Sequence, residues 1–229
     1  MRWIGVLVTA LVLSACAANP PANTTSPTAG QSLDCTKPAT IVQQLVCHDR
    51  QLTSLDHRLS TAYQQALAHR RSAALEAAQS SWTMLRDACA QDTDPRTCVQ
   101  EAYQTRLVQL AIADPATATP PVLTYRCPTQ DGPLTAQFYN QFDPKTAVLN
   151  WKGDQVIVFV ELSGSGARYG RQGIEYWEPQ GRCASISMAP RSSAAPRDAG
   201  QPSPRNIFSA CCRSAGYGLT ISTRRPSAG

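Results

Sequence analysis

Residues 147–162 read AVLNWKGDQVIVFVEL, and this stretch decides the fold of the second half of the chain. Two runs rich in β-branched and aromatic residues are separated by the turn sequence Lys152-Gly153-Asp154, which predicts two antiparallel strands. Similar runs occur at 122–127, 134–140 and 173–177. Short strands joined by turns predict a small antiparallel β-barrel-like domain over residues 122–181.

A different periodicity governs residues 33–113. Apolar residues recur three or four positions apart, as in Leu52, Leu55 and Leu59, and four such segments predict a compact bundle of amphipathic helices. The Pro, Ala and Thr residues of 114–121 predict a linker. The expected fold class is therefore α+β: a small disulfide-linked helical bundle followed by a small antiparallel β-barrel-like domain.

The helical segment contains Cys35, Cys47, Cys89 and Cys98, which allow two disulfides in three connectivities. A helix of roughly ten residues between Cys35 and Cys47 would hold their Cα atoms about 15 Å apart, beyond the reach of a disulfide. An antiparallel pairing of the second and third helices would bring Cys47 near Cys89 and leave Cys35 for Cys98. Geometry therefore favours these two pairs, without excluding the others.

Composition and charge narrow the class of protein. Nine cysteines and only 16% charged residues favour an oxidising compartment over the cytosol. The net charge of +5 comes from the tail 182–229, which has seven Arg and one Asp. Because the body of the chain carries no basic stripe, we expect no nucleic-acid partner.

The first residues predict export and a lipid anchor. Met1-Arg2 precedes an apolar run over 3–13, too short to span a bilayer but typical of a signal peptide. The run ends in Leu13-Ser14-Ala15-Cys16, which resembles the lipobox of bacterial lipoproteins. We expect a signal peptide over 1–15, acylation of Cys16, a flexible tether over 16–32, and attachment to the cell membrane or envelope, facing away from the cytoplasm.

The tail 182–229 is rich in Ser, Ala, Pro and Arg, which predicts disorder. A second interpretation is a frameshift. Residues 182–188 can be back-translated so that a start one base earlier encodes Glu-Val-Arg-Val-Asp-Phe-His, an alternating strand. If the tail is genuine, the predicted disulfide cysteine Cys127 has only Cys183, Cys211 and Cys212 as new candidate partners.

Titratable residues suggest neither a metal site nor a catalytic centre. His48, His57 and His69 are nine and twelve positions apart, a spacing that favours exposed histidines over zinc ligands. Charge pairs such as Arg86-Asp87, or Asp56 with Arg58, are most simply interpreted as a solvated helix face. We expect no cofactor, no metal, no catalytic residue and no enzymatic activity.

Each half of the chain resembles a known protein family. The helical segment resembles the small Cys-rich domain of LprI-type lipoproteins, on the run Leu33-Asp34-Cys35, Val46-Cys47, Leu55-Asp56, Tyr63, Gln79, Trp82, Arg86-Asp87-Ala88-Cys89, Cys98 and Arg106-Leu107. In the second half, Ser163-Gly164-Ser165-Gly166-Ala167-Arg168-Tyr169, followed by Ile174-Glu175-Tyr176-Trp177, is similar to the signature loop of membrane-bound inhibitors of C-type lysozyme, which are small β-barrels. Cys127 matches the cysteine near that family's first strand.

The second resemblance implies C-type lysozyme as the partner. It implies that Ser165 enters the cleft and contacts the two catalytic acids. Gly164 and Gly166 would allow close approach, Arg168 would add charge-assisted hydrogen bonds, and Tyr169 would brace the loop base. The family's lysine-glycine pair after the Trp is missing, because Trp177 is followed by Glu178-Pro179-Gln180-Gly181. The alternative is an envelope interaction module or adhesin in which the Gly-rich loop is only a turn.

Overall fold

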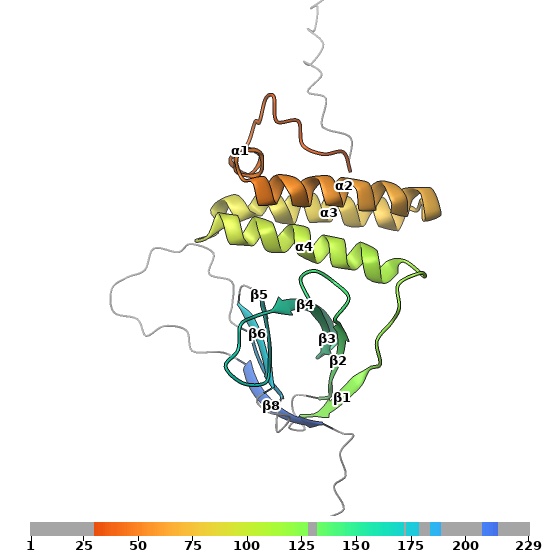
Figure 1. Cartoon of the computed structure of the whole chain (residues 1–229), viewed down its shortest axis with the longest axis vertical. Coiled ribbons are helices and arrows are strands. Elements are labelled where there is room, and N and C mark those ends of the chain that lie inside the picture. Colours follow the sequence, from red (N-terminus) through yellow and green to blue (C-terminus); the bar gives the residue numbers. More distant parts are fainter. Residues whose placement is uncertain (1–29, 128–131, 172, 179–183, 189–207, 215–229) are drawn as a thin grey trace, which may run out of the picture.

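The structure is a computed structural model that describes residues 30–127, 132–171, 173–178, 184–188 and 208–214. A layer of helices lies over one side of a β-barrel, and α4 is the helix nearest to the barrel (Figure 1). The predicted signal peptide, Cys16 and most of the tether lie outside the described residues. The α+β class expected from the two periodicities is confirmed.

Four α-helices form the upper layer in the described part of the chain: α1 (Ile41–His48), α2 (Arg50–Arg70), α3 (Ala73–Ala88) and α4 (Pro95–Ala113). A single residue, Asp49, separates α1 from α2 and accepts hydrogen bonds from the backbone N–H groups of Gln51 and Leu52. Ser72 and Asp94 cap α3 and α4 in the same way. Capping residues therefore divide the segment into helices, and a 3-10 turn, η1 (Cys89–Gln91), follows α3.

The lower layer is a closed antiparallel barrel in which each described strand pairs with the next and the last pairs with the first. The strands are β1 (Leu123–Arg126), β2 (Leu134–Tyr139), β3 (Thr146–Trp151), β4 (Asp154–Val160), β5 (Ala167–Arg171), β6 (Ile174–Glu178), β7 (Ala184–Met188) and β8 (Phe208–Ser214). The predicted hairpin is β3 and β4, with Trp151 opposite Asp154. Strand β5 was not predicted, because most of its residues belong to the segment that was interpreted as a Gly-rich turn.

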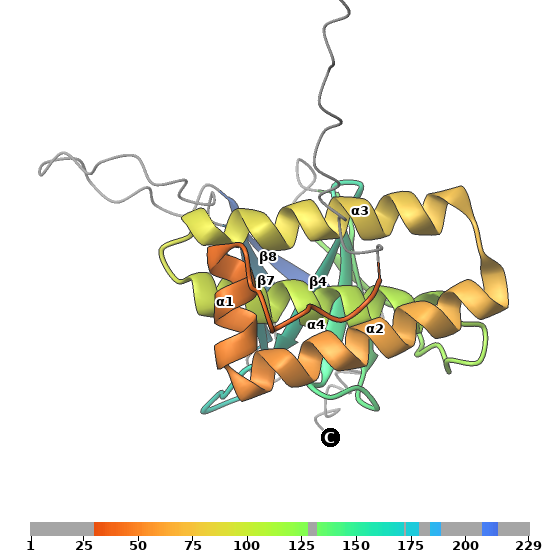
Figure 2. The same ribbon diagram turned by 90° about the horizontal axis from the view of Figure 1, so that it is seen from above.

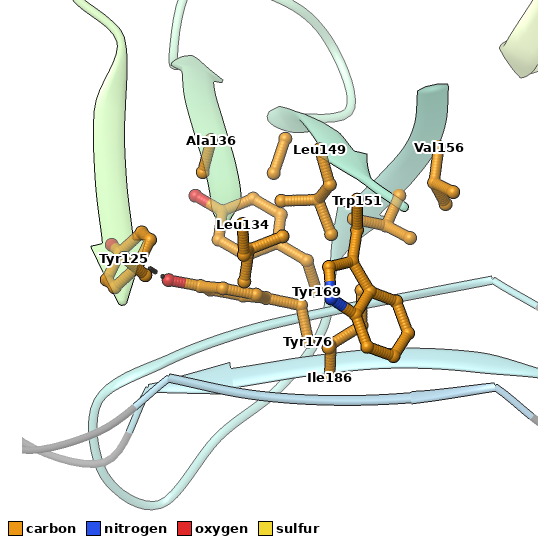
Figure 3. Close-up of a cluster of buried hydrophobic side chains, with 11 residues drawn as sticks. Tyr125, Leu134, Ala136, Leu149, Trp151, Val156, Tyr169, Tyr176 and Ile186 are labelled. Carbon is orange, nitrogen blue, oxygen red and sulfur yellow. Dashed lines mark hydrogen bonds between the residues drawn. The ribbon is translucent and has the colours of Figure 1, made fainter. Parts of the chain in front are cut away.

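Alternate residues of the strands fill the barrel interior. Figure 3 shows this cluster, which includes Leu134, Leu149, Trp151, Tyr169 and Tyr176. Most of these side chains are less than 4% exposed. The interior is therefore a packed core rather than an open cup, as small barrels require.

Some outward-facing residues of β2, β3 and β4 are also buried, because α4 covers them. Val108 and Ile112 of α4 pack against a second apolar cluster on the barrel, formed by Tyr139, Phe142, Val148, Ile157 and Phe159. This arrangement explains why β4 reads as an unbroken apolar run instead of an alternating one. The helical layer and the barrel thus share an apolar seam.

The predicted disulfide pairing was wrong. Cys35 is bonded to Cys47 and Cys89 to Cys98, with Cα separations of 5.5 and 5.6 Å. The helix between the first pair begins only at Ile41, and the preceding residues run along α2 before they turn into α1 (Figure 2). Cys35 therefore folds back beside the last turn of α1. Cys127 is also disulfide-bonded, as its candidacy predicted.

The interpretation of Asp56 and Arg86 as parts of a solvated face was also wrong. Both are buried, at 7% and 5% exposure. Asp56 accepts hydrogen bonds from the Leu33 backbone N–H and from the Tyr103 hydroxyl, both at 2.8 Å. Arg86 donates to Asp87 and to the Tyr103 oxygen and lies over the Trp82 ring. Local spacing could not identify Tyr103 as the shared partner, because it comes from α4 and lies 47 positions from Asp56 in the sequence. The three histidines are exposed, as expected.

Two strands lie in the tail that was interpreted as disordered or frameshifted. Ala184–Met188 pairs with β6, and Phe208–Ser214 closes the barrel by pairing with both β7 and β1. At these residues the prediction of disorder is wrong: pairing of backbone groups with neighbouring strands compensates for a weak apolar alternation. The rest of 182–229 lies outside the described residues.

Candidate functional site

The Gly-rich loop connects β4 to β5. Residues 161–166 are all exposed, and Leu162 is the most exposed large apolar residue of the described chain, at 97%. The Ser163 hydroxyl donates a 2.7 Å hydrogen bond to the Ser165 carbonyl oxygen and accepts one, at 3.3 Å, from the Ser165 backbone N–H. The loop therefore holds its own tip in a tight turn.

Trp177 of β6 holds the same tip from the side. Its indole Nε1 donates a 3.2 Å hydrogen bond to the Ser165 carbonyl oxygen. Trp177 is 37% exposed and lies opposite Arg168 in the β5–β6 pairing. In the described structure the backbone groups of Ser165 are bonded, whereas its side-chain hydroxyl has no hydrogen-bond partner. Because Ser165 is exposed, that hydroxyl is available to a partner.

The two loop glycines play different parts. Gly166 has a φ of +71°, in the left-handed region that favours glycine, where the loop turns into β5. A Cβ built on Gly164 would meet no atom within 4 Å, so the barrel itself does not require glycine there. Gly164 leaves a bare, exposed backbone in the middle of the loop.

Arg168 lies at the base of the loop between two carboxylates. Its Nη2 donates a 2.9 Å hydrogen bond to Glu175 Oε2, and its Nε lies 3.2 Å from Glu161 Oε2. The bond to Glu175, with the charges of both carboxylates, raises the pKa of Arg168 above its usual value. The glutamates on either side were not predicted as partners. The missing information was the β-strand register, which pairs Arg168 with Trp177 and so places Glu175, two residues from Trp177, diagonally across from Arg168.

Tyr169 is buried directly beneath the loop, at 6% exposure. Its ring contacts the rings of Phe138 and Tyr176, with centroid separations of 5.4 and 6.3 Å. Burial raises the pKa of Tyr169. The side chain that follows Arg168 therefore anchors β5 in the barrel core.

A second polar cluster was not predicted from the sequence. It lies in the barrel interior and consists of the hydroxyls of Tyr125 and Tyr176 and the carboxylate of Glu178. The Tyr176 hydroxyl lies 3.0 Å from the Tyr125 hydroxyl and donates to Glu178 Oε2 at 2.9 Å (Figure 3 shows the contact between the tyrosines). Burial, followed by these neighbours, raises the pKa of Tyr176, and burial raises that of Tyr125. The resembled family carries a lysine shortly after the tryptophan. In this chain Trp177 is followed by Glu178, whose carboxylate accepts hydrogen bonds from the hydroxyls of Tyr125 and Tyr176.

The described residues contain no group of three or more His, Cys, Asp or Glu side chains that could hold a metal ion. None of their helices has the length and apolar character needed to cross a bilayer.

Comparison with known proteins covers both domains. Residues 35–113 match the family described as lysozyme inhibitor LprI, and residues 125–192 match the family described as membrane-bound lysozyme-inhibitor of c-type lysozyme. Proteins called Lipoprotein LprI from Mycobacterium bovis and Mycobacterium tuberculosis are 99% identical over 181 residues, which is 79% of this chain and 92% of each relative. No solved structure matches the chain. With both domain types in order and near-identity to these relatives, the chain belongs to the LprI family of lysozyme-inhibitor lipoproteins.

Proposed function

We propose that this protein inhibits C-type lysozyme by placing the Gly-rich loop, residues 163–169, in the active-site cleft of the enzyme. The observation that carries the proposal is the exposed Ser165 hydroxyl, held outward by a loop whose backbone is bonded to Ser163 and Trp177. The names of both matching families support the partner.

The chemistry of the enzyme makes such a loop suitable. A C-type lysozyme hydrolyses glycosidic bonds with two carboxyl groups that face each other across a cleft. A hydroxyl can donate to one of these carboxylates, and a loop without side chains at Gly164 and Gly166 is thin enough to enter. Because the loop is pre-formed, little conformational entropy is lost on binding.

Arg168 has a different role in this proposal from the direct contact that its charge suggested in the sequence. Its guanidinium is held by Glu161 and Glu175, so we assign it to the support of the loop base rather than to a direct contact with the enzyme. The apolar rim around the loop, formed by Val160, Leu162 and Trp177, supplies contact area, since these side chains are 44%, 97% and 37% exposed. Buried apolar contacts at the centre of an interface contribute most to its affinity.

The position in the cell follows from the start of the chain. We propose that Cys16 carries the lipid anchor and that the tether lifts the folded domains away from the membrane, where they meet lysozyme outside the cytoplasm. The protein acts by occupying the cleft and catalyses no reaction of its own.

A cell-wall clearing assay tests the proposal. The purified protein should slow the loss of turbidity caused by C-type lysozyme, and Ser165→Ala should weaken inhibition by roughly tenfold, the effect expected for a hydrogen bond to a charged group. Ser54→Ala, which removes an exposed hydroxyl on α2, is the matched control and should inhibit like the native protein. A native protein that binds envelope components but leaves the clearing rate unchanged would favour the interaction module instead.

A further inference from the structure

A cleft of about 270 Å³ lies where the helical layer meets the barrel, away from the Gly-rich loop. Helices α3 and α4 form its two walls, and Arg171 of β5 lines it from the barrel side. Arg171 Nη1 donates a 3.1 Å hydrogen bond to Thr105 Oγ1 of α4, which ties the two domains together at this point. The cleft therefore lies on the helical domain, at its contact with the barrel.

Arg106 is the unusual residue of this cleft. It lines the wall from α4 and is only 4% exposed. Its Nε donates to Gln79 Oε1 at 2.9 Å and its Nη1 to Gln109 Oε1 at 3.2 Å, whereas its Nη2 is buried with no hydrogen-bond partner. No carboxylate of the described residues forms an ion pair with it, and burial lowers its pKa.

A buried guanidinium held only by neutral amides is costly, because the charge loses its hydration without gaining a counterion. The other buried arginine of this domain, Arg86, shows the contrast, since its Nη2 lies 2.8 Å from Asp87 Oδ1. An anion that enters the cleft would give Arg106 both the missing acceptor and the missing charge. The Arg106 Nη2 atom is covered, so this contact requires a small rotation of a neighbouring side chain.

The lining of the cleft indicates the class of anion. The missing acceptor and the missing counterion both belong to Arg106, and its single positive charge matches a monoanion better than a phosphate dianion. Trp82 and Leu85 provide an apolar side, and Ser81, Thr105 and Gln109 provide hydroxyl and amide groups. We propose that this cleft binds a sugar-sized monocarboxylate that carries hydroxyl or amide groups, with its carboxylate on Arg106.

The closest matched probes are N-acetylmuramic acid and N-acetylglucosamine, which differ by the lactyl carboxylate. Titration calorimetry on the full-length protein should show binding of the acid with a Kd of roughly 1 mM or tighter, and at least tenfold weaker binding of the neutral sugar. Absence of heat from the acid at up to about 10 mM would overturn the proposal. Tighter binding of N-acetylglucosamine 6-phosphate than of the acid would overturn the carboxylate assignment.

Two variants and a control locate the site. Arg106→Gln should weaken binding of the acid by about tenfold or more. If that variant does not fold, Leu85→Trp is the second test: Leu85 is 61% exposed, so a larger side chain fits at the surface and should block the cleft. Arg70→Gln removes an exposed charge from the end of α2 and should bind the acid normally. Binding that survives Leu85→Trp unchanged would place the ligand elsewhere. All three folded variants should still inhibit lysozyme, because the Gly-rich loop is untouched.

Discussion

Trp177 on β6 and Ser165 in the loop are joined by a hydrogen bond of 3.2 Å from the indole Nε1 to the backbone carbonyl oxygen. The bond connects the part of the chain that we expect to enter lysozyme to a strand of the barrel. It also ends on the backbone of Ser165, so it leaves the hydroxyl of that residue available to a partner. The barrel therefore determines where the loop tip points.

Trp177→Phe should separate positioning from contact. Phenylalanine keeps an aromatic ring on the exposed side of β6 and removes only the N–H donor. A net hydrogen bond contributes about 0.5–1.5 kcal/mol, so we expect inhibition to weaken by roughly two- to tenfold while the melting temperature changes little. The inhibition constant from the clearing assay and a thermal melt provide the two measurements. An unchanged inhibition constant would show that this bond does not position the loop.

Two glycines should behave in opposite ways when replaced by alanine. Gly164→Ala meets open space in the isolated protein, so stability should be unchanged, but the added methyl group should weaken inhibition by tenfold or more if the loop backbone lies against the cleft wall. Gly153→Ala, in the β3–β4 turn at φ +88°, should lower the free energy of unfolding by about 1–2 kcal/mol and leave inhibition by the folded protein intact. Equal inhibition by native protein and Gly164→Ala would argue against insertion of the loop.

The buried hydrogen bonds among Asp56, Tyr103 and Arg86 should contribute strongly to the stability of the helical layer. Tyr103→Phe removes the hydroxyl that donates to Asp56 at 2.8 Å and leaves that buried carboxylate with one partner fewer. We expect a loss of about 1.5–3 kcal/mol in the free energy of unfolding, measured by denaturant titration. Tyr63→Phe is the control, since Tyr63 is equally buried but its hydroxyl forms no hydrogen bond with the described residues, and the change should stay within about 0.5 kcal/mol.

Alkaline pH should destabilise the protein through its buried tyrosines. Burial raises the pKa values of Tyr103, Tyr125 and Tyr176 in the folded state. In the unfolded chain these groups ionise near pH 10, so the unfolded state releases protons that the folded state retains. Stability is then full below about pH 10 and falls as the pH rises above it. Tyrosinate absorbance should show that these three tyrosines ionise only when the protein unfolds; their titration in the intact fold would contradict the assignment.

The tail leads to a genetic prediction. We propose that residues 182–229 are a shifted reading of the end of the barrel. The mycobacterial relatives match 181 of the 229 residues, so part of this chain has no counterpart in them. Sequencing of the coding DNA around codon 181 should find a single-base change that restores Glu-Val-Arg-Val-Asp-Phe-His followed by a strand ending in Cys. If no such change restores that strand, the tail is a genuine part of the protein.

The sequence by itself determined the order and type of the two domains, because hydrophobic periodicity is a local property: apolar residues every three or four positions in 33–113, and strand-like runs from 122 onward. It also placed the Ser-Gly-Ser-Gly segment at an exposed turn and predicted the exposed histidines. The disulfide, hydrogen-bond and ion-pair partners of these residues depend on the tertiary structure. Cys35 pairs with Cys47 because the chain folds back before α1, and Asp56 has a hydrogen bond from Tyr103 because α4 packs beside α2. Arg168 is held because the β5–β6 register brings Glu175 diagonally across from it. Each of these contacts joins residues whose separation in space depends on how whole elements pack, and local spacing carries no record of that packing.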